Sequence, residues 1–395
     1  LRQVVDQVTQ LPQPEAAIGA LTTTDRDTWT EERLNLAKLC PRNAENMSVI
    51  DNALFVVCLD DAVDPRTATD LNRSKDHFFH NYNGRNRWMD KSMQVIVLNN
   101  GRAGVNGEHT PSDAATPGTV FNHVLSQEGQ GNLVTNGGYQ GAMPLPLHLR
   151  WQLGPKTAQR IADATARAQS TAAQLGTTLL HFGEFGSEWV KRTARQSPDS
   201  FFQMVLQLAY YRLHGAPCPT YETASTRAFL HGRTDTVRSC SSESLAFTQT
   251  FANPQATAAA KLEALDLAIA SHRDYMQAAS NGQGVDRHLL GLRCMIENSD
   301  EQAKATLFTD PAYVQSMSFR LSTSNLSPGT YFYGGFAPGV PNGYGINYSL
   351  GADQIKLSIS NWKSTSAETD CQDFKRAITQ SLEDLHQIIT TAKTV

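Results

Sequence analysis

One histidine stands where a general base could be displayed. His109 lies in the segment 107–113, which follows a predicted strand over 92–98, a turn at 99–101 and a second short strand over 105–107. Residues at strand exits often carry function, and the unperturbed pKa of histidine, ~6.5, lies near neutral pH. His109 is therefore a candidate general base, and a purely structural role is the alternative.

The other candidate motifs are weaker. His77 and His80 are three residues apart and could share a helix face, but no third ligand is nearby. A core or surface role is therefore favoured over metal binding. The segment Gly129-Gln130-Gly131 lacks the third glycine of a dinucleotide-binding loop, and neither a G-x-S-x-G nor a P-loop sequence occurs. These observations disfavour a serine hydrolase, a nucleotide kinase and a Rossmann-type enzyme.

The predicted helices and strands follow one another along the chain without strict alternation. This mixture predicts an α/β or α+β architecture as the framework that positions His109. Ser197 at the N-cap, Pro198 after it and Gly215 at the end define the clearest helix. The Gly- and Pro-rich stretch 141–155 is the expected domain boundary. Helices are also predicted over 24–39, 156–175, 254–280, 284–297 and 366–392, strands over 318–323, 344–350 and 354–360, and a strand or buried helix over 52–59.

The composition bounds the kind of protein. The 395 residues, with 34 Lys and Arg against 38 Asp and Glu, favour two domains and argue against a nucleic-acid partner. No apolar run approaches the ~18–20 residues that span a bilayer. Six cysteines without a C-x-x-C pair favour reduced thiols in an intracellular compartment. Because the chain opens at Leu1 without a signal or transit peptide, we expect a truncated start.

Seven motifs, in the same order along the chain, resemble those of the carnitine/choline acyltransferase family. The resemblance covers nearly the whole chain and implies that a stretch N-terminal to Leu1 is missing. The motifs are 86–92 (Asn-Arg-Trp-Met-Asp-Lys-Ser) with 107–109 (Gly-Glu-His), 197–199 (Ser-Pro-Asp), 207–211 (Gln-Leu-Ala-Tyr-Tyr), 220–227, 232–239, 286–292, and 321–324 (Leu-Ser-Thr-Ser) with 342–345 (Asn-Gly-Tyr-Gly).

This resemblance implies a fold and a reaction. Family members have an α/β fold of two chloramphenicol-acetyltransferase-like domains with mixed sheets and flanking helices, and an active-site tunnel lies between the domains. We therefore expect residues 1–150 to be the C-terminal part of an incomplete first domain and residues 151–395 to be the second domain. The implied reaction is reversible acyl transfer between coenzyme A and carnitine, or choline in one branch, without a metal or a permanently bound cofactor.

The resemblance also implies catalytic roles. His109 is the implied base, which takes a proton from the carnitine hydroxyl or from the thiol of coenzyme A. Ser324 is the implied hydrogen-bond donor to the tetrahedral oxyanion, with Ser322 in support, and an ordinary polar strand end is the alternative. Asp113 matches an acidic position that orients a cationic residue, and it also suits the first turn of a helix.

The acyl acceptor follows from the charge that must be bound. Carnitine carries a carboxylate that choline lacks, so its enzyme needs a cation and hydroxyl donors. The family supplies them at positions that match Tyr221, Thr234 and Arg287, and Thr223 lies in the same motif as Tyr221. The choline branch replaces the last two of these matched positions. The residues present here therefore favour L-carnitine.

For coenzyme A, the family places lysines before its Ser-Pro-Asp motif to meet the 3′-phosphate. Lys191 matches one of these lysines and Asp199 matches the acid. Ser187 stands where another lysine is usual, and Arg192 or Arg195 could pair with phosphate in its place.

Chain length is predicted from one glycine. Gly334 stands where the acetyl-preferring branch has a bulky residue that blocks the acyl pocket, and segment 333–338 resembles the palmitoyl-transferring mitochondrial branch. We therefore expect a medium- or long-chain acyl group, which gains ~0.8 kcal/mol per buried CH₂. Alternatives are a short-chain enzyme, a catalytically weak paralogue acting as a scaffold subunit, or glycines that serve only a tight turn. A mitochondrial rather than peroxisomal location and peripheral membrane association are expectations from the resemblance alone.

Overall fold

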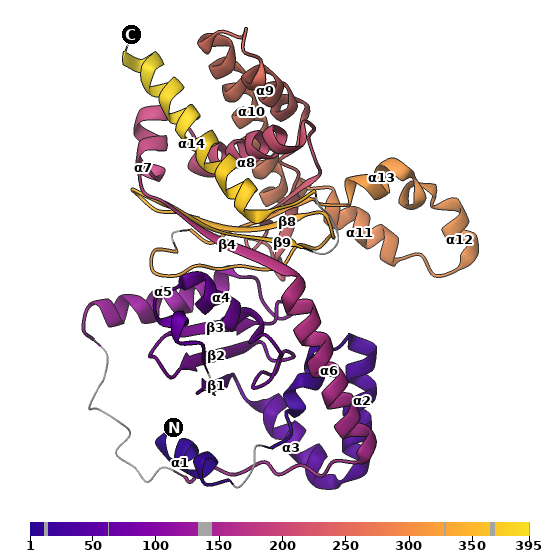
Figure 1. Cartoon of the computed structure of the whole chain (residues 1–395). Coiled ribbons are helices and arrows are strands. Elements are labelled where there is room, and N and C mark those ends of the chain that lie inside the picture. Colours follow the sequence, from indigo (N-terminus) through magenta and orange to yellow (C-terminus); the bar gives the residue numbers. More distant parts are fainter. Residues whose placement is uncertain (12–14, 62, 133–143, 328, 364–367, 395) are drawn as a thin grey trace. The chain divides into compact units, whose positions relative to one another are not determined.

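A computed structural model describes residues 1–11, 15–61, 63–132, 144–327, 329–363 and 368–394 (Figure 1). The chain divides into two compact units: unit 1 comprises residues 1–112 and 123–173, and unit 2 comprises residues 113–122 and 174–395. Each unit combines helices with a mixed sheet, which confirms the expected α/β class. The sequence placed the boundary near residue 150, whereas internal contacts place it at the end of helix α6 (Pro155–Gln174) and assign residues 113–122 to unit 2.

The sheet of unit 1 leads directly to His109. Strand β1 (Val56–Asp60) pairs in parallel with β2 (Met93–Leu98), and β2 pairs antiparallel with β3 (Ala103–Gly107). The predicted strand–turn–strand unit is confirmed, and the ambiguous segment 52–59 contains a strand. Helices α2 (Arg26–Leu39), α3 (Pro41–Asn52) and α6 surround a second apolar cluster that includes Trp29, Leu36 and Ile161.

A buried ionic cluster ties β1 to helix α4 (Leu71–His80). Asp60 Oδ2 lies 2.7 Å from His77 Nε2 and accepts a hydrogen bond from Arg87 Nη2 at 2.8 Å. Burial by itself would raise the pKa of Asp60, but the bonds from His77 and Arg87 outweigh it and hold this pKa below its ordinary value. His77 therefore has the core role that was favoured over metal binding.

Unit 2 is built on a six-stranded mixed sheet of order β4-β9-β8-β7-β5-β6. Strands β8 and β7, and β7 and β5, are parallel, and the other neighbours are antiparallel. The strands are β4 (Leu175–Phe182), β5 (Thr220–Ser225), β6 (Thr234–Val237), β7 (Leu321–Asn325), β8 (Tyr344–Leu350) and β9 (Ile355–Trp362).

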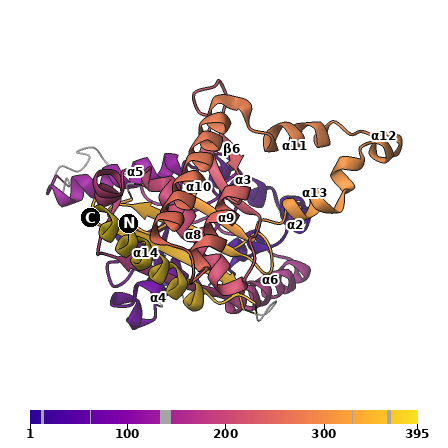
Figure 2. The same cartoon turned by 90° about the horizontal axis from the view of Figure 1, so that it is seen from above.

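The two faces of this sheet differ in chemistry. Side chains alternate along a strand, so Ile355, Leu357 and Ile359 of β9 point to the same side. They join the main hydrophobic core beneath helices α8 (Pro198–His214), α9 (Ser242–Ala252), α10 (Ala258–Ala278) and α14 (Cys371–Thr394), which cover that face (Figure 2). The opposite face carries polar side chains, which include Ser358 and Ser360. The sheet therefore presents a polar face away from its helices.

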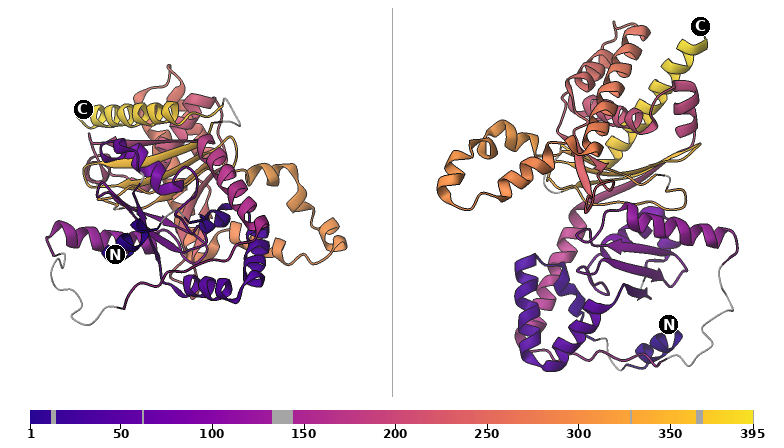
Figure 3. Two further views of the ribbon diagram at one scale, coloured as in Figure 1. Left: turned by 60° about the horizontal axis from the view of Figure 1, so that its bottom comes forward. Right: turned by 180° about the vertical axis from the view of Figure 1, so that it is seen from behind.

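The remaining elements are short or peripheral. Helices α11, α12 and α13 extend away from the sheet (Figure 3). Within the described ranges, no helix combines the length and the apolar character that crossing a membrane requires. These elements are α1 (Arg2–Thr9), η1 (Ile18–Thr23), η2 (Pro65–Ala68), α5 (Ala115–Gly129), α7 (Ser187–Trp189), η3 (Val190–Ala194), η4 (Ala279–Gln283), α11 (Asp286–Cys294), α12 (Ser299–Lys304), η5 (Thr306–Thr309) and α13 (Pro311–Ser316).

Candidate active site

The polar face of the six-stranded sheet gathers five of the predicted site residues of unit 2. Residues that pair directly across neighbouring strands point to the same face. Tyr221 of β5 pairs with Ser322 of β7, and Thr234 of β6 pairs with Ser225 of β5. The two-residue alternation then places five candidates on one face: Tyr221, Thr223, Thr234, Ser322 and Ser324.

Tyr221 is held in place from three sides. Its ring packs edge-on against Phe319, with the ring centroids 5.5 Å apart. Thr223 Oγ1 donates to the Tyr221 hydroxyl at 3.4 Å, and Thr323 Oγ1 donates to the Tyr221 carbonyl at 2.9 Å. The phenol is half-buried and its position is fixed, as a residue that orients a small ligand requires.

Arg287 and Thr234 lie in direct contact, although 52 residues separate them. Arg287 Nη2 donates to Thr234 Oγ1 at 3.3 Å, and its Nε donates to the Thr234 carbonyl at 3.1 Å. Both residues line an open pocket with about 690 Å³ of empty volume, together with Thr226, Phe229, Gly232, Asp235, Gly282, Gly284 and His288. A guanidinium beside a hydroxyl in an open pocket is suited to bind a carboxylate.

Two acidic residues that sequence reasoning passed over fix Arg287. Asp235 Oδ1 accepts from the backbone amides of Arg287, at 3.3 Å, and of Thr236, at 2.7 Å. Asp286 forms a two-point ion pair with Arg238, at 2.7 and 3.1 Å, which fastens the start of α11. Both acids lie inside the quoted motifs 232–239 and 286–292, so their proximity to the predicted cations in sequence was the available signal.

Ser324 lies next to a buried amide. Asn347 of β8 pairs with Ser324 in the sheet, and Asn347 Nδ2 donates to the Ser324 carbonyl at 3.2 Å. Ser322 and Ser324 are both half-buried, so neither side chain is sealed in the core. A hydroxyl on a fixed strand can stabilise a developing oxyanion.

His109 lies in unit 1, in a bend two residues beyond the end of β3. Its side chain is exposed, so solvent can reach the imidazole. Neighbouring Glu108 accepts from the Thr110 amide at 3.0 Å and from the Thr110 hydroxyl at 2.6 Å, which shapes the bend. The local structure therefore displays His109 at a strand exit, as the sequence predicted.

Asp113 belongs to unit 2 and forms an ion pair with Arg233. Asp113 Oδ1 accepts from Arg233 Nη2 at 3.0 Å, and Asp113 Oδ2 accepts from Arg233 Nε at 3.3 Å. The cationic residue that Asp113 contacts is thus Arg233, the residue before Thr234, and its orienting role stays a prediction. Asp113 lies two residues before α5, so the expected first-turn position is close to the observed one.

The structure does not bring the two coenzyme A candidates into one bonded group. Lys191 is exposed in the π-helical turn η3, where its neighbour Arg192 pairs with Glu188 at 2.8 Å. Asp199, in the first turn of α8, accepts from Asn325 Nδ2 and from the Tyr348 hydroxyl, each at 2.7 Å. Asp199 therefore anchors α8 to the helix-covered face of the sheet.

A buried carboxyl supports β5 from behind Tyr221. Glu222 Oε2 lies 2.5 Å from His272 Nε2 and accepts from Ser239 Oγ at 3.0 Å. Burial, and then the neighbouring charge of Asp199, raise the pKa of Glu222 well above its ordinary value. This cluster lies on the helix-covered face of the sheet.

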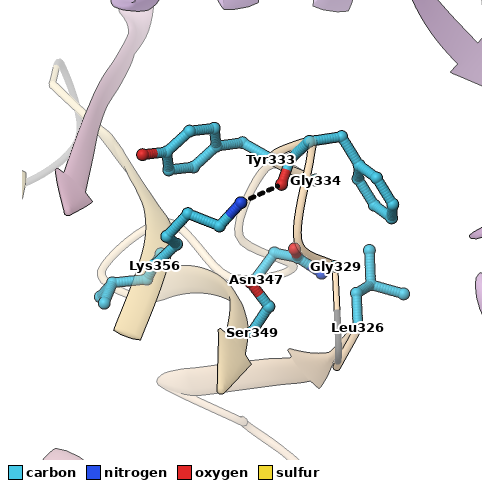
Figure 4. Close-up of a pocket in the computed structure, with 9 residues that line it drawn as sticks. Leu326, Gly329, Tyr333, Gly334, Asn347, Ser349 and Lys356 are labelled. Atoms are coloured by element: carbon cyan, nitrogen blue, oxygen red, sulfur yellow. Dashed lines mark hydrogen bonds between the residues drawn. The ribbon is translucent and has the colours of Figure 1, made fainter. Parts of the chain in front are cut away.

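Gly334 lines a second, smaller pocket on the polar face. Its empty volume is about 180 Å³, and Leu326, Gly329, Phe332, Tyr333, Asn347, Ser349, Lys356 and Leu357 form the rest of its wall (Figure 4). A Cβ at Gly334 would lie 2.5 Å from Asn347 Oδ1 and 2.6 Å from Leu326 Cδ1. The absent side chain therefore leaves no open channel here, contrary to the sequence argument, because neighbouring atoms occupy the space.

Comparison with known proteins places the chain in a family. Residues 1–380 match the family model described as "Choline/Carnitine o-acyltransferase", and the chain belongs to this family. It is 34% identical to carnitine O-acetyltransferase of Rattus norvegicus over 94% of this chain, and 33% identical to choline O-acetyltransferase of Mus musculus over 99% of this chain.

The chain spans about three-fifths of the length of these curated relatives, 59% of the first and 61% of the second. A solved wax ester synthase/diacylglycerol acyltransferase from Marinobacter aquaeolei is also similar, with a TM-score of 0.38 and 12% identity over 85% of this chain and 80% of that chain. A similarity of this size carries no inference about function. Among the described residues, no group of three or more His, Cys, Asp or Glu is arranged to hold a metal ion.

Proposed function

We propose that the protein is a carnitine O-acyltransferase, which transfers an acyl group reversibly between coenzyme A and L-carnitine. One observation carries the proposal: the register of β5, β6 and β7 places Tyr221, Thr223, Thr234, Ser322 and Ser324 on a single polar face, with Arg287 bonded to Thr234. Membership of the choline/carnitine acyltransferase family supports the same reaction.

The choice of carnitine over choline rests on charge. In this proposal the guanidinium of Arg287 and the hydroxyl of Thr234 bind the carnitine carboxylate, and Tyr221 donates a further hydrogen bond. Choline has no carboxylate, so it would leave a cation in the pocket uncompensated. The relatives include both carnitine and choline acetyltransferases, and this pair of residues is what favours the first.

The proposed chemistry is a direct transfer. His109 takes the proton from the carnitine hydroxyl, and the resulting alkoxide attacks the thioester carbonyl of acyl-CoA. The Ser324 hydroxyl donates to the oxyanion of the tetrahedral intermediate. The intermediate collapses by releasing the thiolate of coenzyme A, which takes the proton back from His109. Lys191 is proposed to meet a phosphate of coenzyme A.

The proposal also covers the length of the acyl group that is transferred. The medium- or long-chain preference predicted from Gly334 needs more room than the pocket around it offers, because the described residues that line this pocket leave no space in which even a water molecule would fit. The similarity to acetyltransferases points the same way. We therefore propose short acyl groups for the pocket as it stands, and longer groups only once its wall has moved.

A direct assay tests this function. The complete protein is mixed with acetyl-, octanoyl- or palmitoyl-CoA and with L-carnitine, choline or neither, and release of free thiol is followed. We expect release that depends on carnitine and is fastest with acetyl-CoA. Release only with choline would refute the acceptor, a palmitoyl preference would refute the chain length, and no release above the acceptor-free control would favour the scaffold alternative.

Removing the charge of Arg287 should weaken carnitine binding. We expect Arg287→Gln to raise the KM for carnitine by about 10- to 150-fold, which corresponds to a lost charge-assisted hydrogen bond, with a smaller change in KM for acyl-CoA. Arg293→Gln is the matched control, because Arg293 is exposed on the same helix and lines neither pocket. Equal effects of the two substitutions would contradict the assignment.

A further inference from the structure

A ten-residue segment that includes Gly334 lies across the polar face of the sheet. This segment, residues 329–338, is called the strap below. Three side chains of one strand, β9, fasten it through its backbone carbonyls. Lys356 Nζ donates to the carbonyls of Thr330 and Phe332, Ser360 Oγ donates to that of Phe336 at 2.5 Å, and Trp362 Nε1 donates to that of Pro338 at 3.0 Å.

These three residues share one face of β9 because they are an even number of positions apart. Lys356 pairs across the sheet with Ser349, and Ser358 pairs with Asn347. This is the same face that carries Ser324 and Tyr221, since Asn347 in turn pairs with Ser324. The strap therefore covers part of the surface on which the proposed site is built.

Lys356 is the unusual member of this set. Its side chain is buried, with 6% exposure, and its ammonium lies 2.8 Å from the Thr330 carbonyl and 3.1 Å from the Phe332 carbonyl. Figure 4 shows the Lys356 ammonium pointing toward the segment that carries Tyr333 and Gly334. The ammonium also lies 4.8 Å from the centre of the Tyr333 ring. Within the described ranges no carboxylate forms an ion pair with it, and burial lowers the pKa of Lys356. The strap thus supplies the polar partners that this buried cation has.

Moving the strap would therefore separate the ammonium from its two carbonyl partners. A buried charge that loses its hydrogen bonds raises the free energy more than a neutral donor does. Lys356 therefore holds the strap more strongly than a neutral donor would. Within the strap, Gly334 leaves no room for a side chain beside Asn347, whose side-chain amide donates to the carbonyl of Ser324. An acyl chain that extends into this pocket must displace the strap.

We propose that Lys356 limits the length of the transferred acyl group by holding the strap closed over the pocket beside Gly334. This inference rests on the proposed function, since it concerns the acyl group of the same reaction. Lys356 acts as a positioning residue: it fixes the wall of the pocket. A lysine that only completes the fold would share its burial but would not affect which acyl groups are used.

The substitution Lys356→Met tests the inference, because methionine is apolar and flexible and fills much of the same space. Lys363→Met is the control, since Lys363 is exposed in the turn after β9. Two quantities are measured on the complete protein: the ratio of kcat/KM for octanoyl-CoA to that for acetyl-CoA, and hydrogen–deuterium exchange of the strap amides. We expect Lys356→Met to raise the ratio by about tenfold or more, as one lost charge-assisted interaction implies, and to speed exchange in the strap.

The outcomes separate the inference from the proposed function. Unchanged exchange in the strap would overturn the fastening, and faster exchange with an unchanged ratio would overturn the effect on chain length. If the unsubstituted protein transfers no acyl group, the proposed function fails, and exchange still reports on the fastening. Should Lys356→Met not fold, Ser360→Ala removes a neighbouring fastening with a small change in volume and is expected to shift both quantities in the same direction.

Discussion

Replacing His109 with alanine is expected to lower the rate of acyl transfer to carnitine by about 10²- to 10⁴-fold, the usual contribution of a general base. The imidazole is exposed in a bend beyond β3, so its removal leaves no cavity in the core. The thermal unfolding midpoint should therefore stay within about 2 °C of that of the unsubstituted protein. Steady-state transfer from acetyl-CoA, together with circular dichroism on heating, measures both quantities.

His123→Ala serves as the matched control for His109→Ala, because His123 is likewise exposed but lies within helix α5. The control should keep full activity. Substantial turnover by His109→Ala, or an equal loss in both variants, would remove His109 from the mechanism.

The second large effect is expected on stability. Asp60→Ala should lower the free energy of unfolding of unit 1 by about 3–5 kcal/mol, because it leaves the buried guanidinium of Arg87 without its carboxylate. The side chain of Asp60 is 5% exposed and that of Arg87 is 0% exposed, so removing one partner leaves the other charge buried and unpaired. Urea unfolding followed by circular dichroism measures the change, and Asp61→Ala, at an exposed neighbouring position, is the control.

The same pair predicts the direction of a pH effect. Since the pKa of Asp60 is lower in the folded protein than in the unfolded chain, its stabilising contribution is present above the ordinary value of ~3.9 and is lost as the pH falls below it. The stability difference between the unsubstituted protein and Asp60→Ala should therefore be full at neutral pH and shrink below about pH 4. A difference that does not depend on pH would contradict the ionic origin.

Local signals explain what could be predicted of the fold. Helix α8 begins and ends as expected because Ser197 caps the Ser200 amide and Gly215 adopts a left-handed conformation with φ of 66°. Strands β8 and β9 were found because both are long and carry apolar residues at alternate positions. Strands β4, β5 and β6 were not predicted: β5 and β6 are short and rich in Thr, Glu and Asp, and β4 follows α6 without a break.

For the site, the sequence indicated which residues matter, but their arrangement depends on contacts that are distant in the sequence. Motif resemblance named Tyr221, Thr234 and Arg287, but it did not show how they come together. Tyr221 and Ser322 share a face because β5 pairs with β7, about 100 residues later, and Arg287 reaches Thr234 from a helix. The ion pair of Asp113 with Arg233 is equally non-local. Nothing in the sequence marked Lys356, because a lysine in a strand is usually exposed and its burial becomes apparent only once the strap lies over it.

The alternation along β9 has a consequence for how substitutions in this strand would act. Ile355, Leu357 and Ile359 are constrained by the packing of four helices, so most replacements there endanger folding. Lys356 and Ser360 point to the other surface, where their side chains bond to the strap. If the proposed role of Lys356 holds, replacements at alternate positions of one strand would act on different properties: odd-numbered positions on folding, even-numbered positions on the acyl groups that are used.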